Sequence, residues 1–198
     1  MTGSLKDMIK IRRHLVNLSI LIFLWVAASF ILYVISVYMK YVSTNIFVAT
    51  LTSCLGDIPL SIGGGFLYHH LGPKYAMPIF LAAAIMGSIS LATWAAPDKK
   101  LNIVIMSILV LFTRSGIKCT FDSCYLANAT IFPAIFAGTA FGLCNIGAKL
   151  VTIFAPVMAE ITPPTPMIIF SALSAMALVA ALNIIPPAKE KAKAVSAH

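Results

Sequence analysis

The stretch "GGGFLYHHLGPKYAMP", residues 63–78, decides how this chain folds. It joins the end of one long apolar run to the start of the next through two histidines, a Gly-Pro pair and one lysine. A membrane-spanning helix needs about 20 mostly apolar residues, and each flanking run provides that length. The stretch therefore predicts a tight turn at a membrane surface, with His69 and His70 at the level of the lipid headgroups.

The composition of the chain indicates that lipid is its solvent. Charged residues make up 10% and hydrophobic residues 60% of its 198 residues, whereas a soluble domain has roughly 25% charged residues. The formal net charge of +8 collects in short segments between the apolar runs instead of forming one basic patch. We therefore expect a lipid bilayer, and no nucleic acid, as the partner of this charge.

The apolar runs predict an all-α membrane protein with a single domain of six transmembrane helices. The expected spans are residues 14–38, 44–68, 76–96, 101–127, 139–159 and 165–186. Polar or proline-containing segments separate them: "HHLGPK" (69–74), "APDKK" (96–100), "FPAIFAG" (132–138) and "EITPPTP" (160–166).

Basic residues predict how these spans are oriented. With six spans both termini lie on one side, together with Lys6, Lys10, Arg12, Arg13, Lys74, Lys189, Lys191 and Lys193. The other side holds only Lys40, Lys99 and Lys100. Since positive loops stay on the cytoplasmic side, both termini are expected on a cytoplasm-like side, which in a mitochondrial inner membrane is the matrix. Which membrane holds the chain stays open.

No motif indicates an enzyme, a metal site or a cofactor. The chain has no GxSxG, HExxH or phosphate-binding loop. The His69–His70 pair has no Cys, Asp or Glu close in sequence to complete a metal site. The four cysteines fall inside apolar runs without CxxC spacing, so we expect small, buried and reduced side chains at Cys54, Cys119, Cys124 and Cys144. Close helix approach or a bend is expected at Gly63, Gly64 and Gly65.

Five charged residues lie within the expected spans: Asp57, Arg114, Lys118, Asp122 and Lys149. Arg114, Lys118 and Asp122 are spaced i, i+4, i+8 and so share one helix face. At this spacing Lys118 can pair with Asp122, and pairing of Asp57 with Arg114 or Lys149 could lower the cost of these charges further. A charge at the bilayer centre costs roughly 2.5–3.5 kcal/mol, so these side chains should face protein or a cavity. They are either the remnant of a substrate site or side chains that pair internally or contact a neighbouring protein.

Several stretches resemble transporters of the major facilitator superfamily. That family carries a G-x-L-x-D-R-x-G-R-R loop between the second and third spans of each six-span half, and Gly65, Leu67, Gly72 and Lys74 fit its spacing. The organic cation/anion branch has an L-W-x-x-x-S-F-x-x-Y run in its seventh span, which Trp25, Ser29, Phe30 and Tyr33 match. The stretch 116–158 is similar to the branch's tenth and eleventh spans, without gaps at Gly116, Phe121, Tyr125, Leu126, Pro133, Gly142, Ala148, Lys149, Ala155 and Pro156.

The resemblance implies the C-terminal six-helix half of a major-facilitator-type bundle. In that family the substrate lies between two such halves near the membrane midplane. The second, fourth and fifth spans of this half would then line the cavity, and Lys149 stands where anion-transporting relatives have an arginine.

The sequence departs from the family at charged positions. Histidines replace the Asp and Arg of the loop motif at His69 and His70, while Thr130, Ala137 and Pro187 stand where the family has charged residues. Two functions follow. The favoured hypothesis is a degenerate, non-transporting half that acts as a structural accessory subunit, its second, fourth and fifth spans covered by other integral membrane proteins. The alternative is a half-size organic-ion transporter that works as a dimer or with a separate N-terminal half.

Overall fold

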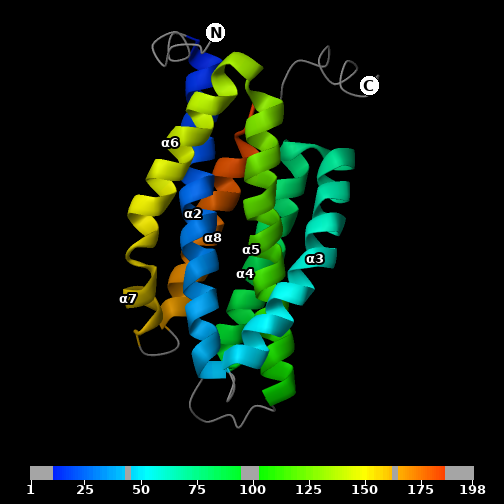
Figure 1. Cartoon of the computed structure of the whole chain (residues 1–198), viewed down its shortest axis with the longest axis vertical. Helices are drawn as coiled ribbons and strands as arrows, with labels where there is room; N and C mark the ends of the chain where they lie inside the picture. The colour runs from blue at the N-terminus through cyan, green and yellow to red at the C-terminus, as the bar shows by residue number, and fades with distance from the viewer. Residues whose placement is uncertain (1–10, 43–45, 95–102, 162–164, 186–198) are drawn as a thin grey trace.

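The computed structural model describes residues 11–42, 46–94, 103–161 and 165–185, and all regular structure in these ranges is helical. Seven helices are described there, labelled as in Figure 1. They are α2 (Arg12–Val42), α3 (Ile46–Leu71), α4 (Pro73–Trp94), α5 (Ile103–Ile131), α6 (Ala134–Thr152), α7 (Ala155–Ala159) and α8 (Thr165–Leu182).

The helices run up and down along the long axis of one bundle (Figure 1). The start of α2, the α3–α4 turn, the α5–α6 turn and the end of α8 lie at the upper end in this view. Contacts in the structure support this arrangement: the Asn17 amide of α2 donates to Ile185 O at 2.9 Å and accepts from Ile185 N at 3.0 Å. We call the end that holds Arg12 and Lys74 the positive end of the bundle.

Four helices in the described residues are long and apolar enough to cross a membrane, not six. They are α2 over Arg12–Val37, α4 over Pro73–Thr93, α6 over Ala134–Thr152 and α8 over Thr165–Leu182. The other two long helices also contain charged residues, Asp57 in α3 and Arg114, Lys118 and Asp122 in α5. The four apolar helices are compatible with a multi-pass membrane protein.

The turn that separates α3 from α4 is shorter than predicted. Helix α3 continues to Leu71, so His69 and His70 belong to its last turn and the predicted position of both histidines in a tight turn is wrong. Only Gly72 stands between the two helices, with a positive φ of 73°. Glycine adopts this left-handed conformation without strain, and Pro73 then starts α4 because a first-turn proline needs no amide donor.

The predicted fifth span is broken in two. Its start was expected at residue 139 after a loop over 132–138, but α5 ends at Ile131 and α6 begins at Ala134. Helix α6 then ends at Thr152, before α7 begins at Ala155. Pro156 explains this break, since it has no N–H to donate to Thr152 O and its ring would clash with that carbonyl.

The bundle core lies where α2, α4, α5 and α8 meet. Its fully buried side chains include Trp25 of α2, Leu81 of α4, Ile117 of α5 and Met167 of α8. Helices α4 and α5 pack closely at Gly116, where a Cβ would lie 2.7 Å from both Ala84 N and Phe80 O.

Two smaller predictions have mixed outcomes. Cys119, Cys124 and Cys144 are buried and free, as predicted, whereas the side chain of Cys54 lies outside the described residues.

Of the three consecutive glycines, only Gly64 packs closely, with Cys119 Sγ 2.9 Å from the position of its Cβ. A Cβ at Gly63 or Gly65 would face open space, so the prediction of close helix approach is wrong at these two positions.

Most of the basic residues used to predict orientation lie outside the described residues or have side chains that are not described. They are Lys6, Lys10, Lys40, Lys99, Lys100, Lys189, Lys191 and Lys193. Pro187 also lies outside the described ranges.

Candidate functional site

The charged residues predicted within the spans converge on one region of the bundle. Four of them, Asp57, Arg114, Lys118 and Lys149, line a cavity of about 210 Å³, here called the central cavity. Its walls come from four helices and are completed by Trp25, Ser29, Leu32, Tyr33 and Ser36 of α2, Phe121 and Tyr125 of α5, and Asn145, Ala148 and Thr152 of α6.

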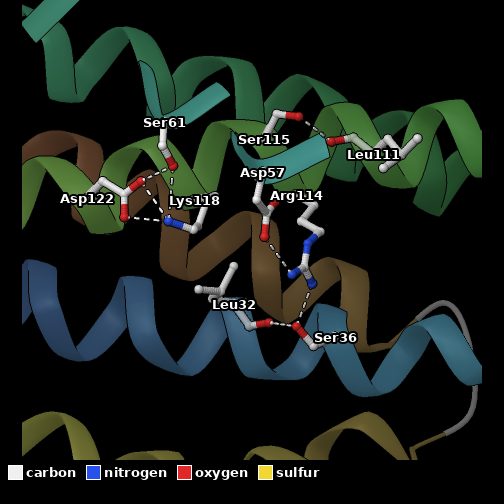
Figure 2. A network of polar contacts seen from close by, with 9 residues as sticks. All are labelled: Leu32, Ser36, Asp57, Ser61, Leu111, Arg114, Ser115, Lys118 and Asp122. Atoms are coloured by element: carbon white, nitrogen blue, oxygen red, sulfur yellow. Dashed lines mark hydrogen bonds and ion pairs between the residues drawn. The ribbon is translucent and has the colours of Figure 1, made fainter. Parts of the chain in front are cut away.

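Arg114 joins three helices at this cavity (Figure 2). From α5 its Nη2 lies 3.0 Å from Asp57 Oδ2 of α3, and its Nη1 donates to Ser36 Oγ of α2 at 2.7 Å. The Ser36 hydroxyl in turn donates to Leu32 O at 2.6 Å. The Arg114 and Asp57 side chains are only 12% and 18% exposed, so both charges depend on this pair for their stabilisation. The predicted pairing of Asp57 with Arg114 is confirmed.

Lys118 and Asp122 form a second ion pair one turn further along α5 (Figure 2). Lys118 Nζ lies 2.5 Å from Asp122 Oδ1 and 2.7 Å from Oδ2. Ser61 of α3 donates to Asp122 Oδ2 at 2.7 Å and lies 3.4 Å from Lys118 Nζ. The predicted i, i+4 pairing of these two residues is confirmed.

Lys149 has a different environment from the other cavity cations. Its Nζ lies 5.8 Å from the centre of the Tyr33 ring, a cation–π distance. Both described aspartates of the site are already paired with residues of α5. Three cations and two anions therefore leave one positive charge in excess, and Lys149 carries it.

Aromatic side chains form the wall of the cavity on the side of the positive end. The Trp25 ring lies 4.4 Å from Tyr125 and 5.4 Å from Phe141, measured between ring centres. Phe121 and Tyr125 are 5.1 Å apart in an edge-to-face arrangement, which is the geometry that aromatic pairs favour. The cavity thus combines an aromatic wall with an excess positive charge.

A second cavity of about 440 Å³, the lateral cavity, lies between α3 and α5. It is lined by Ser61, Gly64 and Gly65 of α3 and by Lys118, Cys119, Asp122, Ser123, Tyr125 and Leu126 of α5. Lys118 and Tyr125 border both cavities. The Lys118–Asp122 pair therefore stands at the boundary between them.

The residues that fit the family loop motif do not join this site. Gly72 forms the α3–α4 turn and Lys74 is the second residue of α4, both at the positive end. Leu67 packs against the bundle core. Gly65 alone borders a cavity, the lateral one.

The described part of the chain brings no further metal ligands to the histidine pair. Among the residues that the structure describes, no group of three or more His, Cys, Asp or Glu side chains is placed to hold a metal ion. His69 and His70 are exposed, with ring centres 5.5 Å apart, and His70 packs against Phe66 at 4.4 Å.

Sequence reasoning missed the serines that complete the two ion-pair clusters. Ser61 stands four residues after Asp57, so the two lie on one face of α3, and this spacing could have indicated it. Trp25, Ser29 and Tyr33 share one face of α2 for the same reason. Ser36 follows Ser29 by seven residues and so lies on the same face of α2, but its bond to Arg114 depends on how α2 and α5 are placed against each other.

No family model matches this chain. The chain is similar to an uncharacterized protein of Caenorhabditis elegans. The two are 35% identical over an alignment of 91 residues, which covers 44% of this chain and 18% of that protein's length. Since 91 residues are 18% of it, that protein is about 500 residues long. Neither comparison names a transporter, so the family resemblance stays a prediction.

Proposed function

We propose that the chain is a six-pass half of a major-facilitator-type transporter for organic anions, and that a second six-helix unit closes its polar face. One observation carries this proposal. Charged, polar and aromatic side chains from α2, α3, α5 and α6 converge on a single cavity inside an otherwise apolar helical bundle. Ligand sites in membrane transporters have this composition and lie between such units.

The lengths of α3 and α5 support six passes. With 26 and 29 residues, they extend about 39 and 44 Å at 1.5 Å per residue, longer than the roughly 30 Å hydrocarbon core. Their charges form internal pairs beside the cavities. An intramembrane charge held in this way does not have to face lipid.

The excess positive charge favours an anionic ligand. Asp57 and Asp122 already have partners on α5, while Lys149 contacts only the face of an aromatic ring among the interactions of the described residues. A carboxylate would replace this weak contact with a charge-assisted hydrogen bond. The aromatic wall would pack against an organic ligand of moderate size.

The proposal places both termini on the cytoplasm- or matrix-like side. Arg12, Arg13 and Lys74 support this orientation, because they lie at the end of the bundle where α2 starts and α4 starts. The partial relative is, at about 500 residues, long enough to contain two units of this size.

The internal ion pairs weaken the main argument for an accessory subunit. In that hypothesis other membrane proteins cover a charged face, and four of the five charges on this face are already paired within the chain.

One contact keeps the accessory role as a second candidate. Thr130, which stands where the family has a charged residue, bonds with Tyr68 of α3 at 3.0 Å. Because the Thr130 hydroxyl already bonds within this six-helix unit, it is not available for a contact that would hold the two halves of a transporter together.

Binding of radiolabelled benzoate to the purified chain in phosphatidylcholine nanodiscs tests the proposal. We expect saturable binding that is lost in Lys149→Ala and retained in Lys149→Arg, which keeps the charge. Absence of saturable binding to the wild-type chain, or equal binding by Lys149→Ala, would overturn the anion-transporter proposal and favour the accessory role.

A further inference from the structure

The Lys118–Asp122 pair differs in kind from the Arg114–Asp57 pair. Arg114 and Asp57 come from different helices, so their contact holds α3 and α5 together. Lys118 and Asp122 are one turn apart on the same helix, and their contact alone joins no two elements. Ser61 of α3 bonds to both side chains and so links the pair to α3, while the Lys118–Asp122 contact itself sets the charge of the cavity wall.

Lys118 satisfies most of the bonding capacity of the Asp122 carboxylate. Both carboxylate oxygens lie within 2.7 Å of Lys118 Nζ, and Oδ2 also accepts the Ser61 hydroxyl. The two side chains are 21% and 31% exposed, so the pair borders open space instead of being sealed in the core. A cation entering the lateral cavity meets a carboxylate that already has its counter-ion.

Without Lys118, the same place would have the composition of a cation site. Asp122 would present a free carboxylate to the lateral cavity, next to the ring of Tyr125. Carboxylates beside aromatic faces bind organic cations through charge and cation–π attraction. The Lys118 ammonium occupies this position from within the chain.

We infer that Lys118, which borders both cavities, is a built-in counter-ion that blocks cation binding at Asp122 in the lateral cavity and adds a positive charge to the wall of the central, anion-binding cavity. This inference rests on the proposed anion-binding function and adds the residue that sets its charge selectivity. Lys149 then recognises the anionic ligand, and Lys118 excludes ligands of the opposite charge.

The test measures two probes, tetraethylammonium and benzoate, on the full chain in phosphatidylcholine nanodiscs. Lys118→Met should bind tetraethylammonium about tenfold more tightly than the wild-type chain, since a single charged contact contributes on that scale. The matched control, Lys118→Met with Asp122→Asn, should lose this gain. Asp122→Asn alone should bind benzoate about tenfold more tightly, because Lys118 is then a second free cation.

Two results would overturn the inference. One is a folded Lys118→Met variant that binds tetraethylammonium no better than the wild-type chain. The other is a double variant that binds it as tightly as the single variant, since Asp122 would then not be the acceptor. If Lys118→Met does not fold, unchanged benzoate binding by Asp122→Asn overturns the inference instead.

The same experiment separates this inference from the proposed function. Wild-type binding of benzoate without a gain for tetraethylammonium in Lys118→Met would leave the function standing and remove the role of Lys118. A gain for tetraethylammonium with no wild-type binding of benzoate would establish the role of Lys118 and remove the anion proposal.

Discussion

Replacement of Gly116 by alanine should loosen the packing between α4 and α5. A Cβ at this position would lie 2.7 Å from Ala84 N and Phe80 O and 3.1 Å from Ala84 Cα. These three are backbone atoms, so no side-chain rotation can relieve the contact and the two helices must move apart. Overpacking of this kind costs about 1–3 kcal/mol.

The helical preference of alanine opposes part of this loss. Alanine is favoured over glycine inside a helix by about 0.5–1 kcal/mol. The difference leaves a net destabilisation of about 0–2.5 kcal/mol. Its midpoint of about 1 kcal/mol corresponds, in a chain of this size, to a fall in Tm of roughly 2–4 °C.

The fraction of monodisperse protein that remains after heating in detergent measures this change. Gly142→Ala on α6 is the matched control, because no heavy atom lies within 4 Å of its Cβ position. We expect Gly142→Ala to retain at least the stability of the wild-type chain. Equal stability of Gly116→Ala and Gly142→Ala would refute the close α4–α5 contact as the cause.

Three further predictions concern the charges, the topology and the histidines. Arg114→Met should destabilise the chain by about 3–5 kcal/mol because it leaves Asp57 buried without a counter-charge, and thermal unfolding should show Asp57→Asn restoring part of this loss; no restoration would refute the pair. Cysteines placed at His69 and at Lys99 should react with an impermeant maleimide from opposite sides of sealed vesicles, and labelling from one side would exclude six passes. Combined alanine substitution of His69 and His70 should leave metal content unchanged by elemental analysis, whereas loss of stoichiometric zinc would reveal a metal site there.

The sequence predicted the helices well and their ends poorly. Apolar runs of about 20 residues are a strong signal, and each of them contains a helix in the structure. Proline is a weak signal, since Pro59 and Pro78 lie inside α3 and α4 without ending them, while Pro156 separates α6 from α7. Membrane helices tolerate proline where neighbouring groups satisfy the freed carbonyl, and the sequence does not show those neighbours.

The site was predictable where one helix carries the pattern. The i, i+4, i+8 spacing on α5 gave both the shared face and the Lys118–Asp122 pair. The contribution of α2 was not predicted as part of the cavity, because Ser36 becomes relevant only through its 2.7 Å contact with Arg114 of α5. Contacts between helices depend on how each helix is rotated about its axis and how deep it lies in the bundle. Hydrophobic runs define neither.

The three-helix contact of Arg114 has a consequence for biosynthesis. In the six-pass arrangement α5 brings three charged residues into the bilayer, each at a cost of roughly 2.5–3.5 kcal/mol near its centre. Ribosomes deliver α2 and α3 first, so Ser36, Asp57 and Ser61 are already present when α5 leaves the translocon. In that arrangement the earlier helices would supply polar partners for α5, and insertion of this helix would depend on the segments made before it.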